Sequence, residues 1–215
     1  MKNNKEALLL CSGGLDSTTL AFWLIRERIS FVPLFIDYGQ HCAYTELATA
    51  KLVLPPSVRS EIRTVNIVDV YKRSSSRLIS EPDLWRESVE DDDLYLPYRN
   101  ILFMSIGAAV AQAEGINIVY SAFINSNHAK EIDCSAEFFR RLATLLAQYG
   151  SVEIRMPFRD FSKLRVAELA IELGVSLGKT YSCQASSRIP CGACPNCVER
   201  LAALRALGEK DAQPQ

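Results

Sequence analysis

Short apolar runs alternate along the chain with longer stretches in which apolar residues recur at helical spacing. Two short apolar runs, at residues 6–11 and 31–37, predict strands, and three further strands are expected at residues 61–67, 116–123 and 152–156. Helical spacing follows near residues 17–28, 43–53, 100–114, 135–149 and 163–173. This alternation predicts an α/β fold with a five-stranded, mostly parallel, doubly wound sheet that carries helices on both faces.

Residues 72–95 interrupt the alternation. They contain a run of three serines, Trp85 and the acidic triplet Asp91–Asp93. A stretch of this length without a strand or helix pattern is either a mobile or substrate-covering insertion or a solvated connection, and the pattern favours neither. We expect the acidic triplet to be solvated rather than to bind a metal.

The composition is that of an ordinary globular protein. A length of 215 residues suits one main domain with a small appendage. The formal net charge of −1 lacks the excess of Lys and Arg that binding to duplex nucleic acid requires, which disfavours nucleic acid as the main partner. The apolar run before Ser12 is too short for a signal peptide or a membrane span, so we expect a cytoplasmic protein without a membrane partner.

The segment between the first expected strand and helix, Cys11 to Thr19 (CSGGLDSTT), has the composition of a phosphate-binding loop. Gly13 and Gly14 let the backbone N–H groups turn inward, and serine and threonine hydroxyls lie at the N-terminus of a helix, whose dipole favours anions. The loop lacks the lysine of G-x-x-x-x-G-K-[ST], so it is not the usual cradle for transfer of a γ-phosphate. It resembles instead SGGxDS, the pyrophosphate loop of PP-loop ATP pyrophosphatases, which cleave ATP between the α- and β-phosphates.

Such a loop suits the transfer of AMP to a carboxylate or amide oxygen, which turns a poor leaving group into a good one. Charge builds on the departing pyrophosphate, where loop amides, Mg²⁺ and basic residues stabilise it. Asp16 is the expected ligand of Mg²⁺, directly or through water. The alternative is an acidic residue that serves only the dipole of the helix.

Four of the seven cysteines lie close together near the C-terminus with the spacing C-x7-C-x2-C-x2-C. Four thiolates with no open position are typical of a structural Zn²⁺ site, which would fix the apolar helix expected at residues 198–207. An iron–sulfur cluster also takes four cysteines. A redox C-x-x-C pair would leave two cysteines unexplained. The cysteines of this cluster are Cys183, Cys191, Cys194 and Cys197.

The other three cysteines, Cys11, Cys42 and Cys134, are scattered along the chain. Disulfides are disfavoured in a chain without an export signal. We expect these residues to be buried, unreactive thiols.

Taken together, these motifs resemble the 7-cyano-7-deazaguanine synthase family of the PP-loop ATP pyrophosphatases. The resemblance covers about residues 5–205 and rests on the loop SGGLDST, Asp37 to His41 (DYGQH), Pro97 to Asn100 (PYRN), Asp133-Cys134 and the terminal cysteines. It implies an ATP-dependent, AMP-forming carbon–nitrogen ligase that converts 7-carboxy-7-deazaguanine and ammonia into 7-cyano-7-deazaguanine (preQ0), the queuosine precursor. The carboxylate would be adenylated and attacked by ammonia, and the resulting amide would be adenylated again and lose AMP.

The resemblance also implies the site residues. Residues 1–180 would form the PP-loop ATP-binding domain and residues 181–215 a zinc-binding segment, in a homodimer. Ser12, Asp16, Arg99 and Lys163 would be catalytic, the last two by balancing phosphate charge, and the four terminal cysteines would hold the zinc. Read without the family, the alternative for Arg99 and for Lys163 is an exposed surface charge. The ATP-binding residues would be Leu10, Cys11, Ser12, Gly13, Gly14, Leu15, Asp16, Ser17, Thr18, Thr19, Leu20, Tyr38, Gln40 and Arg99.

Three segments depart from the family pattern. The family's V-P-G-R-N is LPYRN here, so that Tyr98 replaces a glycine. The family's G-Y-P-D-C-R is KEIDCS, from Lys130 to Ser135, and residues 125–128 (NSNH) replace an acidic, glycine-containing stretch. The pocket for the base is therefore expected to differ, although the ATP motifs are intact.

These departures leave a second function open. A diverged paralogue would transfer the adenylate-activated deazaguanine acyl group to an amine of a protein or nucleic acid, in a defence or modification system. An ATP sensor without turnover is less consistent with the intact Asp16. For another PP-loop amidotransferase or a tRNA thiolase, the sequence shows neither a glutaminase domain nor a basic extension.

Overall fold

The computed structural model describes residues 5–124 and 133–209. Its strands form one parallel sheet with the order β3-β2-β1-β4-β5, which confirms the predicted fold class. The chain leaves β1 for β2 on one side and returns to β4 on the other, so the strand order reverses beside β1. The strands are β1 (Ala7–Leu10), β2 (Phe31–Asp37), β3 (Arg63–Asn66), β4 (Ile118–Tyr120) and β5 (Glu153–Arg155).

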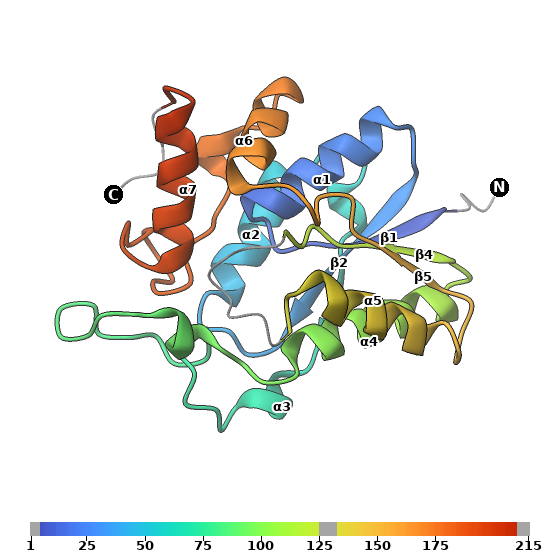
Figure 1. Ribbon diagram of the computed structural model, residues 1–215, viewed down its shortest axis with the longest axis horizontal. Helices are drawn as coiled ribbons and strands as arrows, with labels where there is room; N and C mark the ends of the chain where they lie inside the picture. Colours follow the sequence, from blue (N-terminus) through green and yellow to red (C-terminus); the bar gives the residue numbers. More distant parts are fainter. Residues whose placement is uncertain (1–4, 125–132, 210–215) are drawn as a thin grey trace.

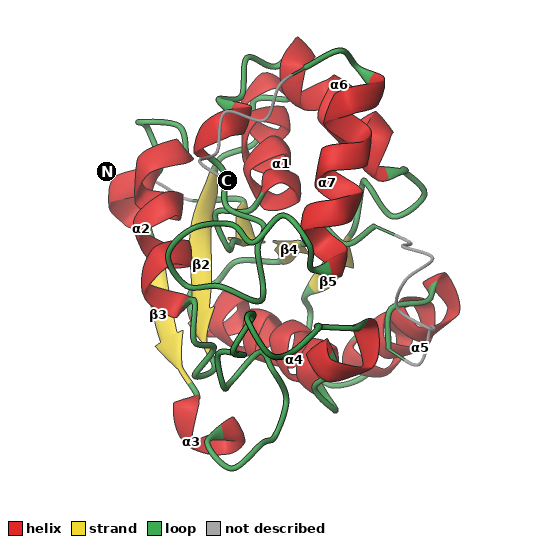
Figure 2. Cartoon of the chain, turned by 90° about the vertical axis from the view of Figure 1, so that its left-hand side faces the viewer, coloured by secondary structure: helices red, strands yellow, loops and turns green. Residues whose placement is uncertain are grey.

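Helices cover both faces of the sheet, as the alternating pattern predicted. Helices α1, α2, α6 and α7 lie on one face, and α4 and α5 on the other (Figures 1 and 2). In the described part of the chain, no helix has the length and apolar composition that crossing a membrane requires. The helices are α1 (Leu15–Arg26), α2 (Ala43–Val53), α3 (Val68–Tyr71), α4 (Arg99–Ala113), α5 (Ala136–Leu146), α6 (Lys163–Glu172) and α7 (Pro195–Ala206).

The apolar runs that predicted β1 and β2 are buried on both sides of the sheet. Along β1, Ala7 and Leu9 pack into the core shared with α1, α6 and α7, whereas Leu8 packs into the core beneath α4. A parallel strand covered on both faces has no polar alternation, which is why these runs read as continuously apolar. The edge strand β3 is mostly exposed, and its sequence RTVN is correspondingly polar.

Helix α7 begins earlier than the sequence predicted. Pro195 occupies its first turn directly after Cys194, the N-cap residue, because a proline needs no hydrogen-bond acceptor for its nitrogen at that position. Ala203 and Leu204 then pack into the core of α1 and α6. The C-terminal segment is thus part of the main core.

Residues 72–95 form a packed insertion beside the four-cysteine segment. Leu78, Val89 and Leu94 share one apolar cluster with Cys183 and Cys194. The Glu81 carboxylate accepts hydrogen bonds from the backbone N–H and the hydroxyl of Ser187, at 2.7 and 2.9 Å. Figure 1 shows this insertion running beneath α7. The acidic triplet Asp91–Asp93 is exposed, as expected.

Tyr98 provides a test of backbone strain. Its φ of 63° lies in the left-handed region that glycine adopts without penalty, and its side chain is 70% exposed, so burial offsets little of the strain. We expect Tyr98→Gly to raise the free energy of unfolding by about 0.5–1 kcal/mol, measured by guanidinium denaturation.

Arg28 is the matched control, because it is exposed and has a φ of 61°. Arg28→Gly should stabilise the protein to a similar extent. If Tyr98→Gly alone destabilised the protein, the tyrosine ring would be making contacts worth more than the strain it imposes.

Candidate active site

A cleft of about 450 Å³ opens at the carboxyl ends of β1, β2 and β4. This is the edge where the strand order reverses, and open α/β sheets bind their ligands at that point. The loop after β1, the segment after β2, the start of α4, the insertion and the four-cysteine segment all contribute to its walls. Segments that the sequence singled out for different reasons therefore meet at one place.

Gly13 fixes the position of the loop after β1. Its φ is 78°, and a Cβ there would lie 2.6 Å from the backbone nitrogen of Ala50 and 2.7 Å from the carbonyl oxygen of Glu46, both in α2. The carbonyl oxygen of Gly13 accepts a hydrogen bond from the backbone N–H of Tyr181 at 3.2 Å. The loop is held between α2 and the segment that leads to the four cysteines.

The N-terminus of α1 is arranged to receive an anion. Among the described residues, no side chain caps the helix at Gly14, so the cap leaves the first-turn N–H groups open. The Ser12 and Ser17 hydroxyls lie 3.3 Å apart beside them, and Ser12 Oγ accepts a hydrogen bond from the Gly14 N–H. Helix dipole, amide groups and hydroxyls together favour phosphate.

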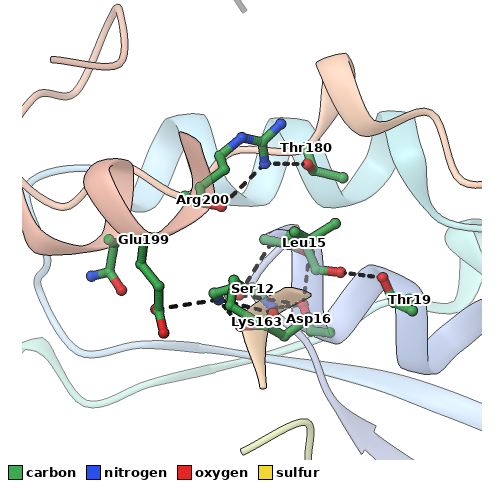
Figure 3. Close-up of polar contacts among 12 residues, drawn as sticks. Ser12, Leu15, Asp16, Thr19, Lys163, Thr180, Glu199 and Arg200 are labelled. Carbon is green, nitrogen blue, oxygen red and sulfur yellow. Dashed lines mark hydrogen bonds and ion pairs between the residues drawn. The ribbon is translucent and has the colours of Figure 1, made fainter. Parts of the chain in front are cut away.

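Asp16 and Lys163 form an ion pair at this end of the cleft (Figure 3). Lys163 Nζ donates to Oδ2 of Asp16 at 2.7 Å and to Oδ1 at 2.9 Å. A second carboxylate, that of Glu199 in α7, lies 3.8 Å from the same nitrogen. The two residues that the sequence assigned to Mg²⁺ and to phosphate are therefore neighbours.

The wall after β2 is organised by Gln40. Its Oε1 accepts from the Tyr38 N–H at 3.0 Å, and its Nε2 donates to Glu46 Oε2 at 2.8 Å. Burial raises the pKa of the Glu46 carboxyl, and the Gln40 hydrogen bond and the Arg99 charge oppose that rise. Burial likewise raises the pKa of the Tyr38 hydroxyl, against the Arg99 charge.

Asn100 organises the wall at the start of α4. It is fully buried, and its Nδ2 donates to the Asp133 carbonyl oxygen at 2.8 Å and to Cys134 Sγ at 3.2 Å. Its Oδ1 has no hydrogen-bond partner among the described residues. Burial, with the nearby Asp133 charge, raises the pKa of the Cys134 thiol to about 11. Cys134 is partly exposed, in contrast to the buried Cys11 and Cys42.

Not all predicted ATP-binding residues line the cleft. Leu15, Thr18, Thr19 and Leu20 are buried in α1, and Thr19 Oγ1 donates to the Leu15 carbonyl oxygen at 2.7 Å. Gly13 and Gly14 contribute backbone rather than wall surface. Those predicted residues that do line the cleft are Leu10, Cys11, Ser12, Asp16, Ser17, Tyr38, Gln40, Arg99 and Lys163.

The three segments that depart from the family pattern have different outcomes. Tyr98 does not line the cleft in the described part of the molecule. Residues 125–128 and the first part of the segment 130–135 lie outside the described residues, which resume at Asp133.

Sequence reasoning missed several polar residues of the cleft wall, among them Glu46, Gln184, Asn196 and Glu199. Gln184 follows Cys183, Asn196 lies between Cys194 and Cys197, and Asn196 Nδ2 donates to Gln184 Oε1 at 2.5 Å. The sequence did contain a signal for Gln184 and Asn196, because both are uncharged amides placed between the cysteines of a metal-binding motif. Glu46 and Glu199 gave no signal, because acidic residues on helices are usually solvated.

The four C-terminal cysteines form a site suited to a metal. Their Sγ atoms all lie within 4.8 Å of one another. Sulfurs at about 2.3 Å from a tetrahedral zinc are about 3.8 Å apart, so the cluster fits Zn²⁺. The N–H groups of Ala193 and Cys194 donate to Cys191 Sγ at 3.4 and 3.2 Å, which stabilises a thiolate.

Comparison with known proteins agrees with these features. The profile of queuosine biosynthesis protein QueC matches residues 6–208. The 7-cyano-7-deazaguanine synthase of Porphyromonas gingivalis (strain W83) is 30% identical over 99% of this chain and 98% of its own length. That of Archaeoglobus fulgidus is 32% identical over 96% of this chain and 88% of its own length.

The fold is also found among solved structures. A 4-thiouridine synthetase in complex with RNA and ATP superposes with a TM-score of 0.54 at 15% identity, covering 97% of this chain and 52% of that one. At this identity the likeness concerns the PP-loop fold alone. The profile match and the near full-length relatives, however, confirm the resemblance that the motifs indicated, and the chain belongs to the queuosine biosynthesis protein QueC family, whose matched relatives are 7-cyano-7-deazaguanine synthases.

Proposed function

We propose that this chain is an ATP-dependent ligase that converts 7-carboxy-7-deazaguanine and ammonia into 7-cyano-7-deazaguanine, with release of AMP and pyrophosphate. The observation that carries the proposal is the meeting of an uncapped α1 N-terminus with Lys163 and Arg99 in one cleft of a member of this family. Fixed amides and cations are the groups that stabilise a departing pyrophosphate.

In this proposal the phosphates of ATP lie over Ser12 to Ser17, and Lys163 and Arg99 balance their charge. Mg²⁺, when bound, neutralises phosphate charge, and Asp16 offers the oxygen ligands that it prefers. Both Asp16 oxygens accept hydrogen bonds from Lys163 Nζ, and they would hold Mg²⁺ if the ammonium turned toward the phosphates. Ordering ATP and substrate in one cleft supplies the alignment that adenylation needs.

Glu46 is the carboxyl group that we assign to proton transfer. It faces the cleft beside Gln40, and burial raises the pKa of its carboxyl above the ordinary value. A carboxylate with a raised pKa is a better acceptor for the proton that ammonia loses as it attacks an acyl adenylate.

Transfer to a larger amine gains no support from Tyr98. Its ring is 70% exposed and, within the described residues, lies outside the cleft wall. Of the departures that raised this alternative, Tyr98 thus contributes nothing to the described cleft wall, and ammonia remains the proposed acceptor.

The function is tested by incubating the purified protein with Mg·ATP, 7-carboxy-7-deazaguanine and ammonium, and following products by mass spectrometry. The proposal expects AMP, pyrophosphate and the nitrile. ADP as the nucleotide product would overturn the PP-loop mechanism. Accumulation of the acyl adenylate in the presence of ammonium would instead indicate another acceptor.

We expect Asp16→Asn and Ser12→Ala to lower the rate of AMP formation by about 10²-fold or more, because each acts on charge at the phosphates. Circular dichroism should show an unchanged fold. Asp69→Asn, which alters an exposed carboxylate on α3, is the control and should keep the wild-type rate. Near-normal turnover of Asp16→Asn would remove Asp16 from the site.

For the cysteine site we expect one zinc per chain by elemental analysis. Cys194→Ser should lose the metal and lower the thermal midpoint, because a structural zinc contributes its binding free energy to folding. Cys134→Ser, outside the cluster, should keep a full complement of zinc. Iron with sulfide in the purified protein would identify a different metal centre.

A further inference from the structure

Lys163 carries a charge that the protein has largely removed from water. Its side chain is only 10% exposed, and a buried ammonium is tolerated only with close counter-charges. Its hydrogen bonds go to Asp16, whose two oxygens both lie within 2.9 Å. If Asp16 turned away to another cation, Lys163 would lose that partner.

Glu199 is the second counter-charge. Its carboxylate lies 3.8 Å from Lys163 Nζ, in ion-pair range but beyond a hydrogen bond, and its side chain is 19% exposed. Figure 3 shows Glu199 and Asp16 reaching the ammonium from opposite sides, from α7 and α1. Lys163 thus lies between a tightly bonded carboxylate and a looser one.

The position of Glu199 is fixed by the segment around the four cysteines. Helix α7 starts after Cys194 and includes Cys197, so Glu199 lies one turn from the metal-binding end of the helix. The adjacent Arg200 is 1% exposed, and its guanidinium donates to Thr180 Oγ1 and the Leu177 carbonyl oxygen, both at 2.7 Å. These contacts hold α7 at a defined distance from the loop.

We propose that Glu199 is a positioning residue for Lys163. By holding the ammonium, Glu199 would allow Asp16 to exchange Lys163 for Mg²⁺ when the nucleotide binds. Once Asp16 releases Lys163, Glu199 remains as its counter-charge and keeps the ammonium at the phosphate end of the cleft. The proposal rests on the proposed ATP site. It gives the four-cysteine segment a part in nucleotide binding, through α7.

If Glu199 acted only through its negative charge, its removal would change the affinity for nucleotide in the opposite direction. A carboxylate beside a polyanion repels it, so removal of that charge alone would tighten nucleotide binding. If Glu199 positions Lys163, removal of the Glu199 carboxylate weakens nucleotide binding. This loss appears only where Mg²⁺ competes with Lys163 for Asp16. The sign of the change and its dependence on Mg²⁺ therefore separate the two roles.

The test is calorimetric titration with α,β-methylene-ATP, which resists cleavage between the α- and β-phosphates, in Mg²⁺ and in EDTA. Glu199→Gln should weaken binding roughly fivefold in Mg²⁺, with little change in EDTA. Zinc content and thermal midpoint should stay at wild-type values, and Glu199→Asp should recover part of the affinity. Glu172→Gln, an exposed carboxylate of α6 bonded to Arg165, is the matched control and should bind as wild type.

A double-mutant cycle tests whether Glu199 acts through Lys163. In the Lys163→Met background, Glu199→Gln should have no further effect on affinity in Mg²⁺. Unchanged or tighter binding by Glu199→Gln, an equal loss in the Lys163→Met background, or loss of zinc from Glu199→Gln would each overturn the inference.

The same titration separates this inference from the proposed function. A wild-type protein that binds the analogue but forms no AMP from ATP would overturn the proposed reaction while leaving the Glu199 test readable. A wild-type protein that does not bind the analogue would overturn both.

Discussion

The close approach of backbone at Gly13 is the constraint on which the rest of the site depends. A side chain there would collide with the backbone of α2, and the Gly13 carbonyl oxygen is hydrogen-bonded to Tyr181. One residue thus sets the distance of the loop from α2 and from the segment that carries the cysteines. The open N-terminus of α1, the Gln40–Glu46 wall and α7 all take their positions relative to this contact.

The sequence predicted the parts of the molecule whose cause is local. Buried strands read as apolar runs, and the loop at Ser12–Ser17 read as an anion cradle because glycine and hydroxyl residues have specific backbone roles. The insertion at 72–95 was ambiguous because Leu78, Val89 and Leu94 are irregularly spaced and gain their burial from residues a hundred positions away. Glu46 and Glu199 were missed for the same reason, since only tertiary packing brings them to the cleft.

The four-cysteine segment is both a folding element and a wall of the cleft. Its cysteines pack with Leu78 and Leu94 of the insertion, while Gln184, Asn196 and Glu199 face the cleft. Short loops rarely hold side chains rigidly, whereas a metal with four ligands fixes the backbone between them. A metal bound there would cross-link the segment and hold Gln184, together with Asn196 and Glu199 in the first turns of α7, at fixed places in the cleft wall.

The described wall of the cleft carries more acidic than basic side chains. Asp16, Glu46, Asp91, Asp92, Asp133 and Glu199 line it, whereas Arg99 and Lys163 are the cations among the described lining residues. A zinc with four thiolates would add two more negative charges nearby. Carboxylates in such excess repel a triphosphate, so in the proposed reaction anion binding would depend on the α1 amides, on the few cations and on metal that arrives with the nucleotide. Lys163 is one of only two such cations in the described wall. The side chains that orient its ammonium therefore affect the proposed chemistry more than their distance from the loop suggests.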